Sequence, residues 1–138
     1  MNYLIDTNVL SELRRPQPEL GVAVWFGRHE RRSLYLSVLT LGEIRKGIAK
    51  LAPGPRREAL DGWLAQDLPL YFSGRVLPID AAVAEEWGRL CAAVQRPLPA
   101  IDGLLAATAL RHGMGLVTRN VRDFEGLGLE VVNPWALP

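Results

Sequence analysis

The sequence predicts one α/β domain in which a parallel β-sheet is flanked by helices. Short apolar runs alternate along the chain with segments whose apolar residues recur at helical spacing, and this alternation is typical of parallel sheets covered by helices. The chain has 138 residues, which is enough for one hydrophobic core. Because 49% of the residues are hydrophobic and only 22% are charged, burial can offset the chain entropy. We therefore expect a single domain over residues 1–138.

The first 51 residues predict two strands, each followed by a helix. Residues 2–5 form an apolar run that stops at Asp6-Thr7-Asn8, where a helix over residues 9–14 begins. Asp6 is therefore expected at the carboxyl end of the first strand. The further elements expected in this part are a helix around residues 22–26, a strand over 34–37 and a helix over 38–51.

The remaining residues predict three more strands and three more helices. Asp102 stands before the last of these helices as a suitable N-cap, and Gly113 follows it as a C-terminal cap. Pro53-Gly54-Pro55 separates the first of the three from the preceding helix. We expect the helices over residues 57–65, 81–94 and 103–112, and the strands over 76–79, 116–118 and 129–132.

The composition narrows the class of protein. The net charge of +1 by itself predicts no nucleic-acid ligand, although residues 1–60 hold ten basic and six acidic side chains. This asymmetry suits either a polyanion partner or ordinary solvated helix faces. Cys91 is alone, so no internal disulfide can form and a reducing compartment is indicated. No signal peptide and no membrane-spanning run is recognisable, and we therefore expect a cytoplasmic protein.

Four acidic residues are expected to gather at one edge of the sheet. Ligands of open α/β sheets lie beyond the carboxyl ends of the strands. Asp6 and Asp123 follow predicted strands, whereas Glu43 and Asp102 lie early in helices that reach the same edge. Closely packed carboxylates raise one another's pKa unless a cation neutralises them. Oxygen ligands suit Mg²⁺ or Mn²⁺, and neither histidine has the spacing of a zinc site. Such ions activate water for phosphodiester hydrolysis.

Each of these acids also has an ordinary structural interpretation. Asp6 and Asp102 are suitable helix caps, and Asp123 is a common type of loop residue. Glu43 can pair with Lys46 three residues later on a solvated helix face. The supporting candidates, which would orient carboxylates or waters, are Thr7, Thr118 and Asn120.

Four blocks of the sequence follow one another in an order that is more specific than any single motif. They are residues 4–12, with Asp6-Thr7-Asn8, residues 36–47, with Gly42-Glu43-Ile44, residues 102–109 and residues 116–124. Together they resemble PIN-domain proteins of the bacterial VapC and FitB type. The ending Val132-Asn133-Pro134-Trp135 resembles the FitB branch, and the similarity covers nearly the whole chain.

The resemblance implies a PIN fold and the activity of a toxin from a type II toxin–antitoxin system. It implies RNA cleavage with Mg²⁺ or Mn²⁺, homodimerisation, and inhibition by a small cognate antitoxin through which the chain reaches operator DNA. By position, the resemblance assigns metal binding to Asp6, Asp102 and Asp123. Glu43 would bind metal or position the attacking water, and Asn120 is an alternative to Asp123 as the fourth site residue.

Two other functions fit the same residues. A non-catalytic PIN-like binding module would act with an antitoxin in DNA-bound regulation and should tolerate Asp6→Asn. A phosphatase would use Asp6 as a covalent nucleophile, but the aspartate expected two residues later is Asn8 here. For dimerisation, the exposed parts of helices bearing Trp25, Phe26 or Trp63 offer an apolar patch.

Overall fold

Five parallel strands form the sheet at the centre of the molecule. The computed structural model describes residues 1–136. Tyr3 pairs with Leu34 on one side and with Gly115 on the other, which makes the first strand the central one. Because all pairs are parallel, the carboxyl ends of the strands share one edge. The strands are β1 (Tyr3–Ile5), β2 (Leu34–Ser37), β3 (Val76–Leu77), β4 (Gly115–Val117) and β5 (Val131–Val132), in the order β3-β2-β1-β4-β5.

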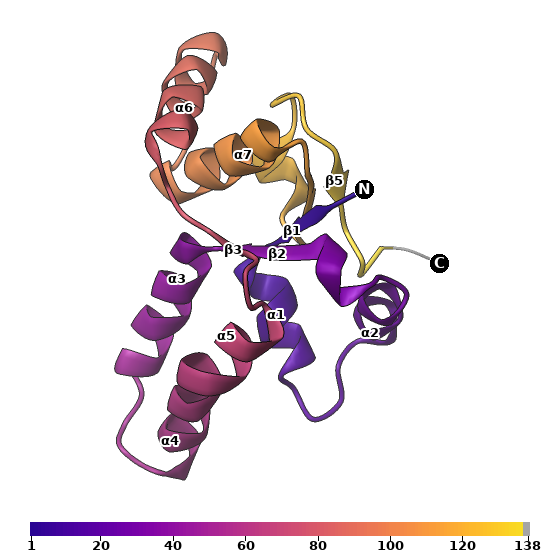
Figure 1. The fold of residues 1–138 in the computed structure, drawn as a ribbon, viewed down its shortest axis with the longest axis vertical. Coiled ribbons are helices and arrows are strands. Elements are labelled where there is room, and N and C mark those ends of the chain that lie inside the picture. The colour runs from indigo at the N-terminus through magenta and orange to yellow at the C-terminus, as the bar shows by residue number, and fades with distance from the viewer. Residues whose placement is uncertain (137–138) are drawn as a thin grey trace.

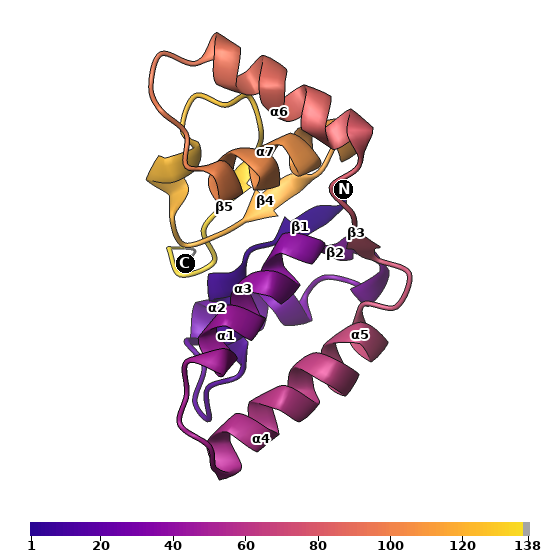
Figure 2. The same ribbon diagram turned by 90° about the vertical axis from the view of Figure 1, so that its left-hand side faces the viewer.

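Helices cover both faces of this sheet, which confirms the predicted fold class (Figure 1). Figure 2 shows α6 and α7 on one side and the first five helices on the other. The first group is α1 (Thr7–Leu13), α2 (Leu20–Gly27), α3 (Val38–Ala49), α4 (Pro55–Gly62) and α5 (Leu68–Tyr71). The second is α6 (Ala81–Ala93) and α7 (Ala100–His112), and short turns η1 (Arg31–Ser33), η2 (Trp63–Asp67) and η3 (Val121–Phe124) complete the fold.

The core has two parts because successive side chains of a strand point to opposite faces. Leu4 and Leu116 are fully buried and pack in a cluster with Leu105 of α7. Their neighbours Ile5 and Val117 are equally buried and belong to the cluster beneath α1, α2 and α3. The central strands are therefore apolar on both faces, as the uninterrupted apolar runs predicted.

Most predicted elements differ from the observed ones by one or two residues at an end, as in α1, which begins at Thr7 rather than at residue 9, and two helices differ more. Helix α7 begins at Ala100 with Pro99 in the N-cap position, so Asp102 lies in the first turn and the N-cap interpretation is wrong. The prolines at 97 and 99 keep the preceding segment out of the helix, and α7 begins directly after Pro99, three residues before the start predicted after Asp102. The helix predicted over 57–65 instead starts at Pro55, and helical backbone continues through the π-helical η2 and α5 to Tyr71. Gly113 ends α7 with φ 64°, as expected of a C-terminal cap.

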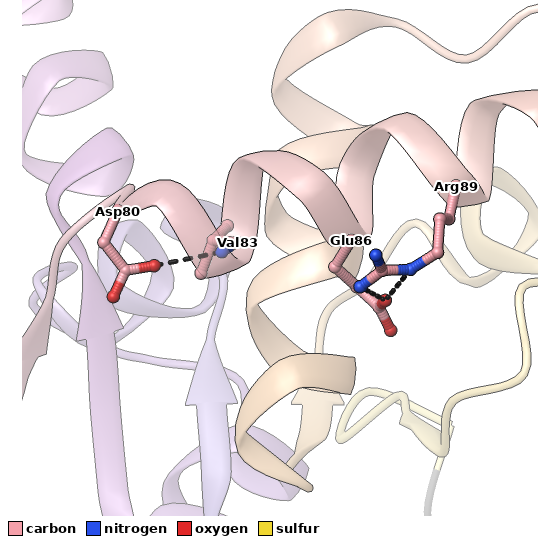
Figure 3. A network of polar contacts seen from close by, with 4 residues as sticks. All are labelled: Asp80, Val83, Glu86 and Arg89. Carbon is pink, nitrogen blue, oxygen red and sulfur yellow. Dashed lines mark hydrogen bonds and ion pairs between the residues drawn. The ribbon is translucent and has the colours of Figure 1, made fainter.

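Helix α6 is capped by Asp80 and packs closely on α7. The Asp80 carboxylate accepts a hydrogen bond of 3.0 Å from the Val83 amide, and an ion pair joins Glu86 to Arg89 one turn later (Figure 3). A Cβ atom on Gly103 of α7 would lie 2.9 Å from the indole nitrogen of Trp87. The absence of a side chain at Gly103 thus lets the two helices approach next to Asp102.

The aromatic residue Trp25 is a core residue. Its side chain is 7% exposed, lies edge-on to Tyr3 and stacks on His29 with ring centroids 3.9 Å apart. Trp25 therefore contributes nothing to the exposed apolar patch expected on its helix, because α2 turns this residue toward the sheet. Phe26 and Trp63 are partly buried against the same cluster. Within residues 1–136, each helix is too short or too polar to cross a bilayer.

Candidate functional site

Asp6 is the most rigidly held of the predicted site residues. It directly follows β1 and caps α1, with Oδ1 accepting a hydrogen bond of 2.7 Å from the Thr7 amide. Its Oδ2 accepts one of 2.8 Å from the Thr118 hydroxyl and one of 3.3 Å from the side-chain amide of Asn8. With only 7% of the residue exposed, the carboxylate is fixed at the point where β1 and β4 end.

Burial raises the pKa of the Asp6 carboxyl above its ordinary value of 3.8. The hydrogen bonds from Thr118, Thr7 and Asn8 act in the opposite direction, because they stabilise the charged form. The negative charge of Asp123 adds to the rise. The ionised carboxylate is thus costly in the folded chain, and a positive charge nearby would stabilise it.

Glu43 reaches the same edge from α3. Ser37 at the end of β2 caps this helix by accepting from the Leu39 amide at 3.0 Å, which directs α3 away from the sheet edge. The Thr7 hydroxyl donates a hydrogen bond of 2.9 Å to Glu43 Oε1. In the described part of the chain no ion pair joins Glu43 to Lys46, so that alternative is wrong. Thr7 therefore links the Asp6 turn to Glu43.

Asp102 is half-buried in the first turn of α7, and the charges of the other three acids influence the pKa of its carboxyl. Burial raises the pKa of its carboxyl, and the charges of Asp123, Asp6 and Glu43 raise it further, in that order. The guanidinium of Arg96 lowers it. The segments that carry the four acids all lie at the carboxyl ends of the strands, and the charges of the other three acids reach Asp102.

Asp123 and Asn120 both belong to the turn that follows β4. Asp123 is exposed in η3, and its charge raises the pKa of both Asp6 and Asp102. Asn120 precedes η3, and its backbone amide donates a hydrogen bond of 3.1 Å to the Thr118 hydroxyl. Asp123 contributes negative charge to the cluster, whereas the described contact of Asn120 comes from its backbone.

Asn8 is a site residue that the sequence reasoning missed. Its side-chain amide donates to Asp6 Oδ2 and, at 3.2 Å, to the Thr118 hydroxyl. Its side-chain oxygen accepts a hydrogen bond of 3.1 Å from the Arg119 amide. Asn8 thereby fastens the end of β1 to the end of β4. The signal lies in the Asp-Thr-Asn triplet, which indicates a helix start and belongs to the first of the ordered blocks, but neither of these interpretations assigns a role to Asn8 itself.

Among the described residues 1–136, no group of three or more His, Cys, Asp or Glu side chains is arranged so that it could hold a metal ion. The candidate donors are nonetheless all carboxylate oxygens, and burial first and then the charges of the other three acids raise the pKa of Asp102. This donor chemistry fits a hard divalent cation such as Mg²⁺ or Mn²⁺, which would draw the carboxylates together.

The fold and the site define a class of protein: a parallel α/β domain with an acidic cluster at the carboxyl edge of its central strands. The family profile of the PIN domain matches residues 3–128. The chain therefore belongs to the PIN-domain family, as the ordered sequence blocks predicted.

Relatives of known name extend over nearly the full chain. The VapC ribonuclease Y4jK of Sinorhizobium fredii is 36% identical over 135 residues and covers 96% of both chains. Toxin FitB of Neisseria gonorrhoeae is also 36% identical over 135 residues, covering 96% of this chain and 97% of its own. A solved structure of FitAB bound to an IR36 DNA fragment superposes with a TM-score of 0.91, at 36% identity and covering 99% of this chain and 97% of the other.

Proposed function

We propose that this chain is a metal-dependent endoribonuclease and the toxin component of a type II toxin–antitoxin system. The observation that carries the proposal is the position of Asp6, Glu43, Asp102 and Asp123 on four segments at the carboxyl edge of the sheet, where the charges of the other three add to burial in raising the pKa of Asp102. Relatives of similar length named as a VapC ribonuclease and as toxin FitB support it. The activity is hydrolysis of RNA phosphodiester bonds.

We assign the four acids different roles, metal binding or water positioning, according to their contacts. We assign metal binding to Asp6, Asp102 and Asp123, with Mg²⁺ or Mn²⁺ as the resident ion. Such an ion supplies a water of lowered pKa and positive charge for the phosphate. Glu43 binds the ion or positions the attacking water. Its carboxylate is exposed, and its described side-chain hydrogen bond comes from the Thr7 hydroxyl.

The neutral polar residues orient these carboxylates. Thr118 donates to Asp6 and is fully buried, so its hydroxyl is held in one place. Thr7 joins Asp6 to Glu43 through its amide and its hydroxyl. Asn120 in turn fixes Thr118 through its backbone amide. Hydrogen-bond partners of this kind stabilise the orientation of metal ligands.

We further propose a small antitoxin protein as the partner, with operator DNA reached only through it. Solved complexes of FitAB and VapBC bound to DNA superpose on this chain over nearly its full length, with TM-scores of 0.91 and 0.77, and support this partner. The proposed working form is a cytoplasmic homodimer of a single PIN domain over residues 1–138.

A groove beside the acidic cluster suits an apolar segment of that antitoxin. The groove has a volume of about 500 Å³ and runs from Thr7 and Glu43 between α1, α3 and α4. Its lining includes the apolar Ile48, Leu60 and Trp63. Amphipathic helices commonly bind such grooves. A segment seated there would also cover Glu43 and block the site.

The proposed function is tested by incubating purified chain with total RNA in the presence of Mg²⁺, Mn²⁺ or a chelator. We expect cleavage by wild type with metal, none with chelator, and none from Asp102→Asn. The cleavage products and the melting temperature of each protein are measured together. If folded wild type leaves every RNA class intact with either metal, the non-catalytic binding module replaces the nuclease proposal.

A further inference from the structure

Arg96 connects the segment between α6 and α7 to the turn that carries Asp123. Its Nη2 donates one hydrogen bond of 2.8 Å to the Glu125 carbonyl and a longer one of 3.3 Å to the Asp123 carbonyl. Both acceptors lie at the end of η3, 27 and 29 residues further along the chain. One side chain from outside the turn therefore contacts the backbone at Asp123 itself and two residues beyond it.

The turn that Arg96 contacts has few hydrogen bonds of its own to fix its orientation. η3 is a single 3₁₀ turn, and the Asn120 side chain before it donates or accepts no capping hydrogen bond. Phe124 is 2% exposed and anchors the turn in the core, whereas its neighbour Asp123 is exposed on the surface. Gly126 follows with φ 76°, where the chain leaves the turn. A short turn of this kind depends on outside contacts for a fixed orientation.

The charge of Arg96 is available to the acidic cluster. The side chain is exposed and forms no ion pair within residues 1–136, because its described acceptors are neutral carbonyl groups. Its positive charge nevertheless lowers the pKa of Asp102. Arg96 thus holds the backbone of the turn while leaving the Asp123 carboxylate free to bind another group.

We propose that Arg96 is a positioning residue, which holds η3 so that the Asp123 carboxylate faces the other three acids. This inference rests on the proposed function, since it concerns how the acidic cluster binds its divalent cation. Arg96 acts through the backbone of the turn and is not assigned a contact with RNA.

The experiment measures Mn²⁺ binding directly by electron paramagnetic resonance of the free ion, without RNA. It compares wild type with Arg96→Ala, Arg96→Lys and the control Arg89→Ala. Arg89 is an exposed arginine of α6 that pairs with Glu86 and has no described contact with η3 (Figure 3). We expect Arg96→Ala to weaken Mn²⁺ binding about tenfold, as is typical for residues that support metal ligands. Arg96→Lys, which keeps a cationic donor, should recover most of the affinity, and Arg89→Ala should match wild type.

Cleavage of RNA by the same proteins separates positioning from substrate contact. Positioning predicts that Arg96→Ala loses activity at low Mn²⁺ and regains it when Mn²⁺ is raised about tenfold, with an unchanged melting temperature. Unchanged Mn²⁺ binding in Arg96→Ala overturns the inference, whether KM for RNA rises or nothing changes. Equal weakening by Arg89→Ala also overturns it, because any lost positive charge would then suffice. If wild type itself neither binds Mn²⁺ nor cleaves RNA, the proposed function fails instead.

Discussion

Replacing Asp6 with asparagine should remove the chemistry of this carboxylate while keeping its structural role. Asparagine caps helices as well as aspartate does, so one oxygen can still accept from the Thr7 amide. The other oxygen becomes an NH₂ group, which cannot accept from Thr118 and Asn8. The Thr118 hydroxyl already accepts from the Asn8 side-chain amide and the Asn120 backbone amide, so it can accept from the new NH₂ group only by giving up one of these, which leaves a net loss of about one to two hydrogen bonds, or about 1–2 kcal/mol. Removal of a buried charge whose pKa is raised acts in the opposite direction.

The free energy of unfolding should therefore change by no more than about 2 kcal/mol, equivalent to about 6–10 °C in melting temperature for a chain of this size. RNA cleavage should fall about 100-fold or more, since even supporting residues of metal sites contribute 10- to 100-fold. The matched control is Asp80→Asn, because Asp80 caps α6 through Val83 on the far side of the sheet from α1 (Figures 2 and 3).

Circular dichroism melting and metal-dependent cleavage are measured for both variants. Asp80→Asn should melt near wild type and cleave at the wild-type rate. The reasoning is refuted if Asp6→Asn keeps cleavage within a few fold of wild type. It is also refuted if the variant loses more than about 3 kcal/mol of stability, because Asp6 would then be chiefly a structural residue.

Three further results are expected. Gly103→Ala should destabilise the fold by about 1–2 kcal/mol in urea unfolding, since its Cβ would overlap the Trp87 indole. The control Gly88→Ala on α6 meets nothing within 4 Å and should stabilise the fold by about 0.5–1 kcal/mol. A gain of stability in both variants would contradict the close approach of α6 and α7. The raised pKa of Asp6 means that the folded chain binds a proton more tightly there than the unfolded chain, so its contribution to stability is lost as pH rises above the ordinary 3.8. Without metal, the stability of Asp6→Asn relative to wild type should accordingly grow as the pH rises above about 4, and a difference that falls with rising pH would contradict a raised pKa of Asp6. Ala59→Glu places a charge on the wall of the groove and should weaken binding of the co-expressed antitoxin about tenfold or more in a pull-down titration. RNA cleavage by this variant should be unchanged. Undiminished antitoxin binding would place the antitoxin elsewhere.

The strands, and the position of Asp6 at the carboxyl end of the central strand, were predictable because their sequence signals are local. Asp6 ends an apolar run that becomes β1, and the run before Thr118 becomes β4. The parallel arrangement follows from helices between successive strands. A chain whose three inner strands are buried on both faces has few alternatives to this sheet.

Other features depend on contacts between distant residues and carry no local signal. Asp102 is equally favourable as an N-cap or in the first turn of a helix, and only the structure of the segment around Pro99 decides where α7 begins. The bonds of Asn8 to Thr118 and Arg119 join segments about 110 residues apart. Arg96 has a partner turn 27 residues later, and no periodicity connects the two.

The pairing of β1 with β4 has a consequence for biosynthesis. β1, which ends at Ile5, is synthesised well before its hydrogen-bonded neighbour β4, which is completed only at Val117, 112 residues later. The hydroxyl that holds Asp6 in place belongs to the very next residue, 112 positions after the carboxylate it contacts. Translation that stops before residue 118 therefore leaves Asp6 without both the neighbouring strand and the hydroxyl that hold it, and without Asp123 as well.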